Sequence, residues 1–305
     1  MPSVSSVEEA AKTLAAAHAG GRRLRIGDDL TTGGLDRILE HETGDLTCTV
    51  EAGLRLSTLN ALLDESGQRL SLDPPGDPTV GALLATNLSG PLRHRFGTPR
   101  DLVLGVTLVL ADGTIASAGG KVVKNVAGYD LARLVCGSRG RFALIVRASF
   151  RLHPLPKATG TLVVETDDAP TVVARLARSQ LQPCALDVLH PGRVAVLFEG
   201  SERAVEAQLR SASALVGGSE SSPEVWKESR ERQASAGGRE CFAPGDLPRV
   251  LAEVPDAVVR AAAGVAYTRD PRPSDKLSQG DCPDARQLLL ARIEQALDPR
   301  GVFAA

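Results

Sequence analysis

Two glycine-containing segments of this chain carry residue types that suit binding of a ligand through the backbone. The first, DPTVGALLATNLSG, spans residues 77–90 and is rich in small side chains. Small side chains let backbone amides approach a phosphate group or the edge of a ring that bulkier residues would exclude. The same composition also suits close packing of a helix. The residues alone leave both interpretations open.

The second segment is the turn GSRG, residues 137–140, which is followed by an apolar strand beginning near residue 142. Such a turn can expose backbone donors and a hydroxyl group to a ligand, and the backbone of Ile145 can read the edge of a ring. Tyr129 lies just upstream with Lys121 and Lys124. It is either a half-buried anchor or a ligand contact, and the lysines are either solvated or phosphate-neutralising. The pattern suggests a backbone cradle and no catalytic triad.

The runs that hold these segments resemble a known family. Residues 74–115, PPGDPTVGALLATNLSGPLRHRFGTPRDLVLGVTLVLADGTI, and residues 122–145, VVKNVAGYDLARLVCGSRGRFALI, are similar to the FAD-binding domain of PCMH-type flavoproteins, the vanillyl-alcohol-oxidase superfamily. Within that superfamily they most resemble the FAD-binding subunit of glycolate oxidase. The resemblance covers about residues 1–156, with a weaker echo in ALDPRGVF, residues 296–303.

The resemblance implies an α+β fold, with a two-lobed FAD-binding domain followed by a smaller antiparallel α+β cap domain. It also implies FAD as the cofactor. Carried over position by position, it implies cofactor contacts at Gly27, Pro78, Thr79, Val80, Gly81, Ala85, Thr86, Asn87, Gly90, Tyr129, Gly137, Ser138, Gly140 and Ile145.

The resemblance is incomplete in two respects. Related metal-dependent dehydrogenases have a His-x-Gly-Asp-Gly-Asn-x-His segment, which this chain lacks, and His94 and His153 have no partner at a metal-ligand or base spacing. We therefore expect no metal site, and the catalytic residue stays unknown. Secondly, Asp28 and Asp29 follow Gly27 where the family has a glycine-rich diphosphate loop, and two carboxylates would repel a diphosphate. Alternatively both point outward, while residues 31–34 approach the phosphates.

Composition limits the class of protein. The 305 residues suffice for two domains, and a net charge of −2 argues against nucleic-acid binding. The five cysteines are scattered, with no C-x-x-C pair, so we expect neither disulfides nor an iron–sulfur site in this chain, and a cytoplasmic location. No run is apolar enough to cross a membrane. The N-terminus reads as a helix with Ser6 and Glu9 at capping-box spacing, and not as a targeting segment.

The order of elements predicts three parts: an FAD-binding domain at 1–156, a cap domain at 157–284, and a helix at 285–305 that returns to the FAD-binding domain. In the first part we expect a strand at 22–26, a helix at 35–41, a strand at 46–53, a helix at 59–66, a hairpin at 102–118 and a strand at 142–152. In the second we expect strands at 159–166, 185–190 and 193–200, a helix from Pro170 capped by Asp168, and a helix at 201–216. We also expect a mobile segment or insertion from Gly217 to about Gly238.

The leading hypothesis is an FAD-binding subunit that transfers electrons from oxidation of a small 2-hydroxy acid, beside a second flavoprotein subunit and an iron–sulfur subunit. Through these partners it could lie at the inner face of the membrane. A basic group such as Arg93 or Arg95 would then hold the carboxylate of the acid. The alternatives are a free-standing FAD-dependent dehydrogenase and a degenerate scaffold subunit that has lost FAD, the latter motivated by Asp28 and Asp29.

Overall fold

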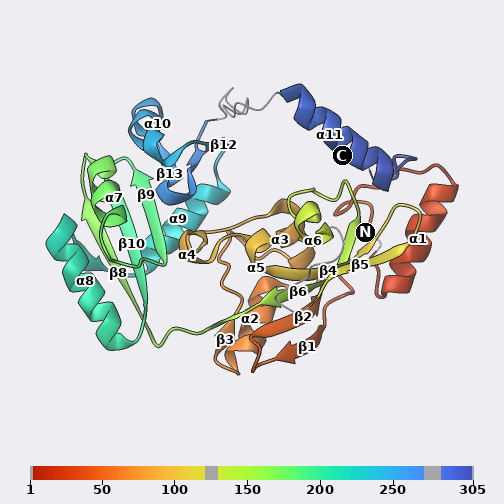
Figure 1. Cartoon of the computed structure of the whole chain (residues 1–305), viewed down its shortest axis with the longest axis horizontal. Coiled ribbons are helices and arrows are strands. Elements are labelled where there is room, and N and C mark those ends of the chain that lie inside the picture. The colour runs from red at the N-terminus through yellow and green to blue at the C-terminus, as the bar shows by residue number, and fades with distance from the viewer. Residues whose placement is uncertain (1–2, 121–129, 271–282, 304–305) are drawn as a thin grey trace.

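The structure is a computed structural model that describes residues 3–120, 130–270 and 283–303. It contains a five-stranded, a seven-stranded and a two-stranded sheet, each with antiparallel strands, and helices pack beside them (Figure 1). We call the part around the five-stranded sheet the first lobe and the part around the seven-stranded sheet the second lobe. The expected α+β fold is confirmed.

The first lobe is built on the strand order β1-β2-β6-β4-β5. The two-stranded sheet pairs β3 with β7. The strands are β1 (Ile38–Glu42), β2 (Thr47–Glu51), β3 (Gln68–Arg69), β4 (Val103–Val109), β5 (Ile115–Gly119), β6 (Leu144–Arg151) and β7 (His153–Pro154); the helices are α1 (Val7–Ala19), α2 (Leu56–Asp64), α3 (Val80–Thr86), α4 (Arg93–Phe96), α5 (Pro99–Leu102) and α6 (Leu131–Val135).

Two predicted elements of the first lobe are wrong. Residues 35–41 were expected to be helical, but β1 begins at Ile38 and pairs with β2, because the sheet pairing prevails over the helical spacing of the apolar residues. The expected strand at 22–26 makes only single bridges, one of them between Leu24 and Phe303. The expected order of strand, helix and strand over residues 22–53 is therefore not formed. The first helix does begin as expected, with the Ser6 hydroxyl accepting from the Glu9 amide at 3.0 Å.

The second lobe has the strand order β11-β8-β10-β9-β13-β14-β12. Its apolar core packs under α7, α8 and α10. The strands are β8 (Ala158–Glu165), β9 (Ala185–His190), β10 (Arg193–Gly200), β11 (Ser219–Ser221), β12 (Gly238–Cys241), β13 (Ala257–Arg260) and β14 (Val265–Thr268); the helices are α7 (Ala169–Ala177), α8 (Glu202–Val216), α9 (Glu224–Ala234), α10 (Leu247–Glu253) and the short 3₁₀ turns η1 (Pro244–Asp246) and η2 (Ala261–Ala263).

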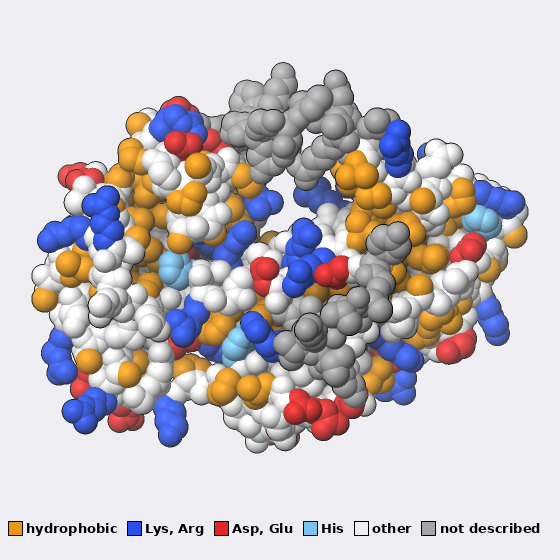
Figure 2. Space-filling model, viewed as in Figure 1, with side chains coloured by type: hydrophobic (Ala, Val, Ile, Leu, Met, Phe, Trp, Pro, Cys, Tyr) orange, Lys and Arg blue, Asp and Glu red, His pale blue; other side chains and the backbone are white. Residues whose placement is uncertain are grey.

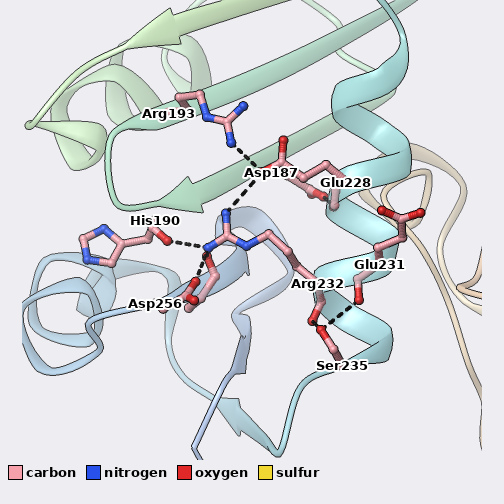
Figure 3. Close-up of polar contacts among 10 residues, drawn as sticks. Asp187, His190, Arg193, Glu228, Glu231, Arg232, Ser235 and Asp256 are labelled. Atoms are coloured by element: carbon pink, nitrogen blue, oxygen red, sulfur yellow. Dashed lines mark hydrogen bonds and ion pairs between the residues drawn. The ribbon is translucent and has the colours of Figure 1, made fainter.

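The segment from Gly217 to Gly238 forms regular secondary structure, so the expectation of a mobile segment is wrong. It holds β11 and α9, and Trp226 of α9 is only 5% exposed. Figure 3 shows how Arg232 attaches α9 to the second sheet: its Nη2 donates to the His190 carbonyl at 2.5 Å and contacts the carboxylate of Asp256. The polar composition of the segment reflects a helix in which Glu228 and Arg232 pair with residues of the sheet side, while Lys227 and Glu231 are exposed and pair with each other.

The last helix, α11 (Pro283–Leu297), lies beside the first lobe, and the chain end after it packs into that lobe (Figure 1). Val302 and Phe303 belong to the same buried cluster as Leu14 of α1. Asp298 supports this ending, because its two carboxylate oxygens accept from the amides of Val302 and Phe303 at 2.8 and 2.7 Å. Within the part of the chain that the structure describes, no helix is long and apolar enough to span a membrane.

Candidate functional site

A cleft of about 550 Å³ opens in the first lobe where three segments of the chain meet. These segments are the loop at 26–33, the helix α3 with its cap, and the turn that leads into β6. The cleft is lined by Ile26, Gly27, Leu30, Thr31, Thr32, Gly33, Arg55, Thr79, Gly81, Ala82, Ala85, Thr86, Arg139, Gly140, Ala143, Leu144 and Ile145. Small, apolar and hydroxyl side chains dominate this lining. Such a lining suits a large flat ligand with polar ends.

Helix α3 presents its small residues to the cleft because its large residues are needed elsewhere. Val80, Leu83 and Leu84 are fully buried in the core of the lobe, which fixes the rotation of the helix. The opposite face carries Ala82 and Ala85, which line the cleft. Both interpretations of the small residues therefore hold at once: one face of the helix packs, and the other face is open to a ligand.

The 137–140 turn is held against the end of α3 by two backbone hydrogen bonds. The Gly137 amide donates to the Leu84 carbonyl at 2.9 Å, and the Arg139 amide donates to the Ala85 carbonyl at 2.8 Å. Gly140 has φ +78°, and a Cβ built there would lie 3.0 Å from the Cβ of Ile26. Gly140 therefore permits the close approach of the turn to the 26–33 loop across one end of the cleft.

The carboxylates of the 26–33 loop do not line the cleft. Asp29 accepts from the Arg25 amide at 2.9 Å, and both Asp28 and Asp29 lie within 4 Å of the Arg25 guanidinium, at 3.8 and 3.9 Å. Gly27 supplies the turn with φ +99°, and Thr31, Thr32 and Gly33 come to the cleft. Of the two alternatives for this loop, the geometry favours the one in which the carboxylates point outward.

Two arginines in the lining were not predicted as site residues. Arg55 precedes α2 and donates from Nη1 to the Asp77 carbonyl at 2.6 Å, and Arg139 is exposed in the cleft with φ +53°. No Asp or Glu is among the described residues that line the cleft. The position of Arg139 between two turn glycines could have indicated it from the sequence. No feature of the sequence indicated Arg55, because only the folded chain brings it to α3.

The structure brings together half of the predicted cofactor residues in the lining and places six others outside it. Those in the lining are Gly27, Thr79, Gly81, Ala85, Thr86, Gly140 and Ile145. Those outside it are Pro78, Val80, Asn87, Gly90, Gly137 and Ser138; Tyr129 lies outside the described residues.

The residues behind the lining support the cleft in identifiable ways. Asn87 ends α3 in the left-handed conformation, at φ +51°, and its side chain accepts from the Arg100 amide at 3.1 Å. Gly90 packs so closely that a Cβ would lie 1.7 Å from the Asp73 carbonyl oxygen. Ser138 is 3% exposed, and its hydroxyl has no hydrogen-bond partner among the described residues. A hydroxyl in that position is available to a ligand or a water molecule.

The two histidines singled out by the sequence have structural surroundings. The ring of His153 packs on Phe96 with 4.7 Å between centroids, and burial lowers its pKa to about 4. Burial also lowers the pKa of His94, which lines an apolar groove of the second lobe together with Leu176 and Pro244. Both rings are therefore predominantly neutral at pH 7.

The lining fits a flavin dinucleotide on three counts. The small residues leave room for the cofactor. At Gly140 the turn approaches the 26–33 loop too closely for a side chain. The charged side chains among the described lining residues are arginines, which suit a diphosphate. Residues 29–119 match the family model of the FAD binding domain. The chain therefore contains an FAD binding domain, with FAD as its cofactor.

Curated proteins similar to this chain carry related names. Glycolate oxidase subunit GlcE of Escherichia coli (strain K12) is 34% identical over 201 residues, which cover 64% of this chain and 56% of that protein. D-lactate dehydrogenase of Archaeoglobus fulgidus is 35% identical over 166 residues, covering 52% and 36%. Glycolate oxidase subunit GlcD of Bacillus subtilis (strain 168) is 32% identical over 160 residues, covering 51% and 34%. The expected resemblance is confirmed. The chain spans about half the length of GlcE and about a third of the other two.

A solved structure with the same fold is alkyldihydroxyacetonephosphate synthase. It is 15% identical in sequence, superposes with a TM-score of 0.73, and the match covers 99% of this chain and 74% of that one. The likeness extends over both lobes, so the arrangement of an FAD binding domain followed by a second antiparallel sheet is that of a known fold.

Proposed function

We propose that this chain is an FAD-dependent oxidoreductase subunit that passes on electrons from the oxidation of a small 2-hydroxy acid. The observation that carries the proposal is the cleft itself: among the described residues, small side chains, two arginines and no carboxylate line it, within an FAD binding domain. The names of GlcE and the D-lactate dehydrogenase support the class of substrate. We also propose the division into an FAD-binding domain, a cap and a returning helix. The two sheets have separate hydrophobic cores, and the chain passes from one to the other near Pro156.

In this proposal the residues of the chain bind, orient and shield the cofactor. FAD, when bound, supplies the two-electron acceptor, and the protein supplies position and electrostatics. Arg55 and Arg139 neutralise the diphosphate, while Ala82 and Ala85 give the flat face of the cofactor an apolar surface. The backbone at Ile145 holds the far end of the ligand. None of these residues acts as a base.

We further propose that the chain works beside a second flavoprotein subunit and an iron–sulfur subunit, which take the electrons onward. The names of GlcE and GlcD, each a glycolate oxidase subunit, support the first partner. The iron–sulfur partner and a cytoplasmic location at the inner face of the membrane stay predictions from the family resemblance. A free-standing dehydrogenase is the second candidate. It is favoured because the chain has a complete second lobe beside the first.

Anaerobic reduction of the FAD-loaded chain tests this function. Addition of glycolate or D-lactate to the isolated chain should bleach the visible flavin band if the chain oxidises the acid itself. If the chain works only as a subunit, bleaching should require the partner subunits or a chemical reductant. A flavin that accepts electrons neither from the acids, nor from the partners, nor from dithionite would contradict both forms of the proposal.

A further inference from the structure

A group of basic side chains lies where the two lobes meet. We call Arg93, Arg239, Arg260 and Tyr267 the arginine cluster. The strand register places three of them on one face of the second sheet, since Tyr267 of β14 pairs directly with Arg239 of β12 and with Val258, two residues before Arg260, on β13. Arg93 comes from α4 of the first lobe and lies near the Tyr267 side chain, and its Nη1 donates to the Ser89 hydroxyl at 3.5 Å. Figure 2 shows Lys and Arg side chains gathered beside the hollow between the lobes.

Arg260 is the buried centre of this cluster. It is 2% exposed, and its guanidinium carbon lies 4.9 Å from the centre of the Tyr267 ring. Its Nη2 donates to Gln233 Oε1 at 2.7 Å, and its Nε lies 3.6 Å from Asp187 Oδ1. Its Nε and Nη1 have no hydrogen-bond partner among the described residues. A buried guanidinium with unused donors is costly, unless a ligand or water accepts from them.

The cluster carries more positive than negative charge. Arg93 lies near both Arg239 and Arg260, and burial together with these two cations lowers the pKa of its guanidinium. The carboxylates around Arg260 are Asp187 and Asp73, and Asp73 also faces Arg230 at 3.8 Å. The described residues therefore place the three guanidiniums of the cluster, together with that of Arg230, beside two carboxylates. Such an excess of charge, partly removed from water, is an attractive site for an anion.

The cluster is connected to the cofactor cleft through one buried side chain. Gln233 of α9 accepts from Arg260 and donates from Nε2 to the Ser89 carbonyl at 3.0 Å. Ser89 follows α3, the helix that lines the cleft, and precedes α4, which carries Arg93. The anion site is thus held by the same short segment, residues 87–93, that ends the cofactor-lining helix. A ligand bound there lies on the second-lobe side of the cleft.

We propose that the arginine cluster binds the carboxylate group of a small organic acid. A planar guanidinium can pair with a carboxylate through two parallel hydrogen bonds, and the Tyr267 hydroxyl adds a further donor. That this acid is the 2-hydroxy acid to be oxidised rests on the proposed function. The Arg95 side chain, the other basic group singled out by the sequence, instead reaches Gln182 at 3.5 Å.

Isothermal titration of the full-length chain with oxalate and glycolate at constant ionic strength tests the inference. Arg239→Gln is the informative variant, because Arg239 is exposed and its loss should leave the fold intact. We expect Arg239→Gln to weaken oxalate binding by at least about tenfold, since a hydrogen bond to a charged group is lost. Arg239→Lys should retain part of the affinity. Arg269→Gln, which removes an exposed arginine beyond the end of β14, should bind like the unmodified chain.

The titration is run with and without saturating FAD, so that this inference and the proposed function fail separately. Oxalate binding that depends on Arg239 supports the cluster, even if the chain never reduces its flavin. An FAD-loaded chain that does not bind oxalate, or that binds it equally well with Arg239→Gln, overturns the inference. Inorganic phosphate that binds as tightly as oxalate, or ethylene glycol that binds as tightly as glycolate, would show that a carboxylate is not the group recognised.

Discussion

Arg139 combines a left-handed backbone with a charged side chain in the cofactor cleft, a conformation that is uncommon for a residue with a Cβ. The hydrogen bond from its amide to Ala85 holds the backbone in place. Arg139→Gln removes the charge and keeps most of the side chain. We expect it to weaken FAD binding about tenfold, because a charge-assisted contact to the diphosphate is lost. Riboflavin, which has no phosphate, should bind unchanged. Quenching of flavin fluorescence measures both affinities.

The control for that change is Arg133→Gln, since Arg133 is an exposed arginine of α6 whose charge is paired with Asp130. It should leave the affinity for FAD unaltered. Equal losses for FAD and riboflavin in Arg139→Gln would mean that the side chain shapes the turn and does not contact the diphosphate.

Gly140 offers a prediction about stability. An alanine there would have to adopt φ +78° and place its Cβ 3.0 Å from Ile26. Gly140→Ala should therefore lower the free energy of unfolding by about 1–2 kcal/mol. Gly44→Ala, at a site where a Cβ meets no atom within 4 Å, should change it little. Urea denaturation of the three chains compares them, and equal midpoints would contradict the close approach described for Gly140.

At the scale of elements, much of the fold could be predicted from the sequence. The hairpin of β4 and β5, the strand β6 and the helices α7 and α8 follow from alternation and capping residues. The strand β1, which begins at Ile38, could not be predicted, because the apolar residues there have helical spacing and the strand depends on pairing with β2. Helix α9 was missed because its stabilising partners, Asp187 and Asp256, are distant in sequence. In the candidate site, the segments rich in small residues could be recognised from the sequence, whereas Arg55 reaches the cleft only through the fold.

Helix α9 should be a fixed part of the second lobe. Trp226, the single tryptophan of the chain, is buried, and its indole N–H donates to Thr161 Oγ1 at 2.9 Å. Trp226→Ala should lower the free energy of unfolding by about 3–5 kcal/mol, because a large buried side chain is removed. Lys227→Ala, at the exposed neighbouring position, is the control. If the two variants denatured at the same urea concentration, the packing of α9 would be refuted.

The loop before α3 contains a group whose titration should couple to stability. Burial raises the pKa of Asp73 to about 7, while Leu92 donates its amide to the carboxylate at 2.9 Å. Because the folded chain holds this proton more tightly than the unfolded chain, stability should fall as pH rises from about 4 to 7 and stay level above it. The slope is at most about 1.4 kcal/mol per pH unit.

Asp73→Asn isolates this contribution, because an amide oxygen can still accept from Leu92 and carries no charge. The difference in stability between Asp73→Asn and the unmodified chain should grow in favour of the variant from pH 5 to 7 and then level off. Other titrating groups, His153 among them, contribute equally to both chains and cancel. A difference independent of pH would show that Asp73 titrates in the normal range.

At the scale of the whole molecule, the two lobes are joined by buried polar contacts. Arg69 of β3 pairs with Glu199 of β10 through bonds of 3.0 and 2.5 Å, and Gln233 of α9 reaches the Ser89 carbonyl. The side chains of Arg69 and Glu199 are 16% and 7% exposed. Partly desolvated pairs of this kind fix the relative position of two parts of a structure more than they stabilise it. The arginine cluster therefore keeps a defined distance from the cofactor cleft.

Binding of FAD by the first lobe, in the cleft between α3 and the 26–33 loop, can be read from the visible absorption spectrum of the purified full-length chain. The spectrum is recorded before and after incubation with FAD and removal of the excess, and again after denaturation. We expect a flavin spectrum that stays with the folded protein, release of the cofactor as FAD on denaturation, and less bound flavin in Arg139→Gln. A folded chain that remains colourless in excess FAD would contradict it and favour the scaffold without FAD.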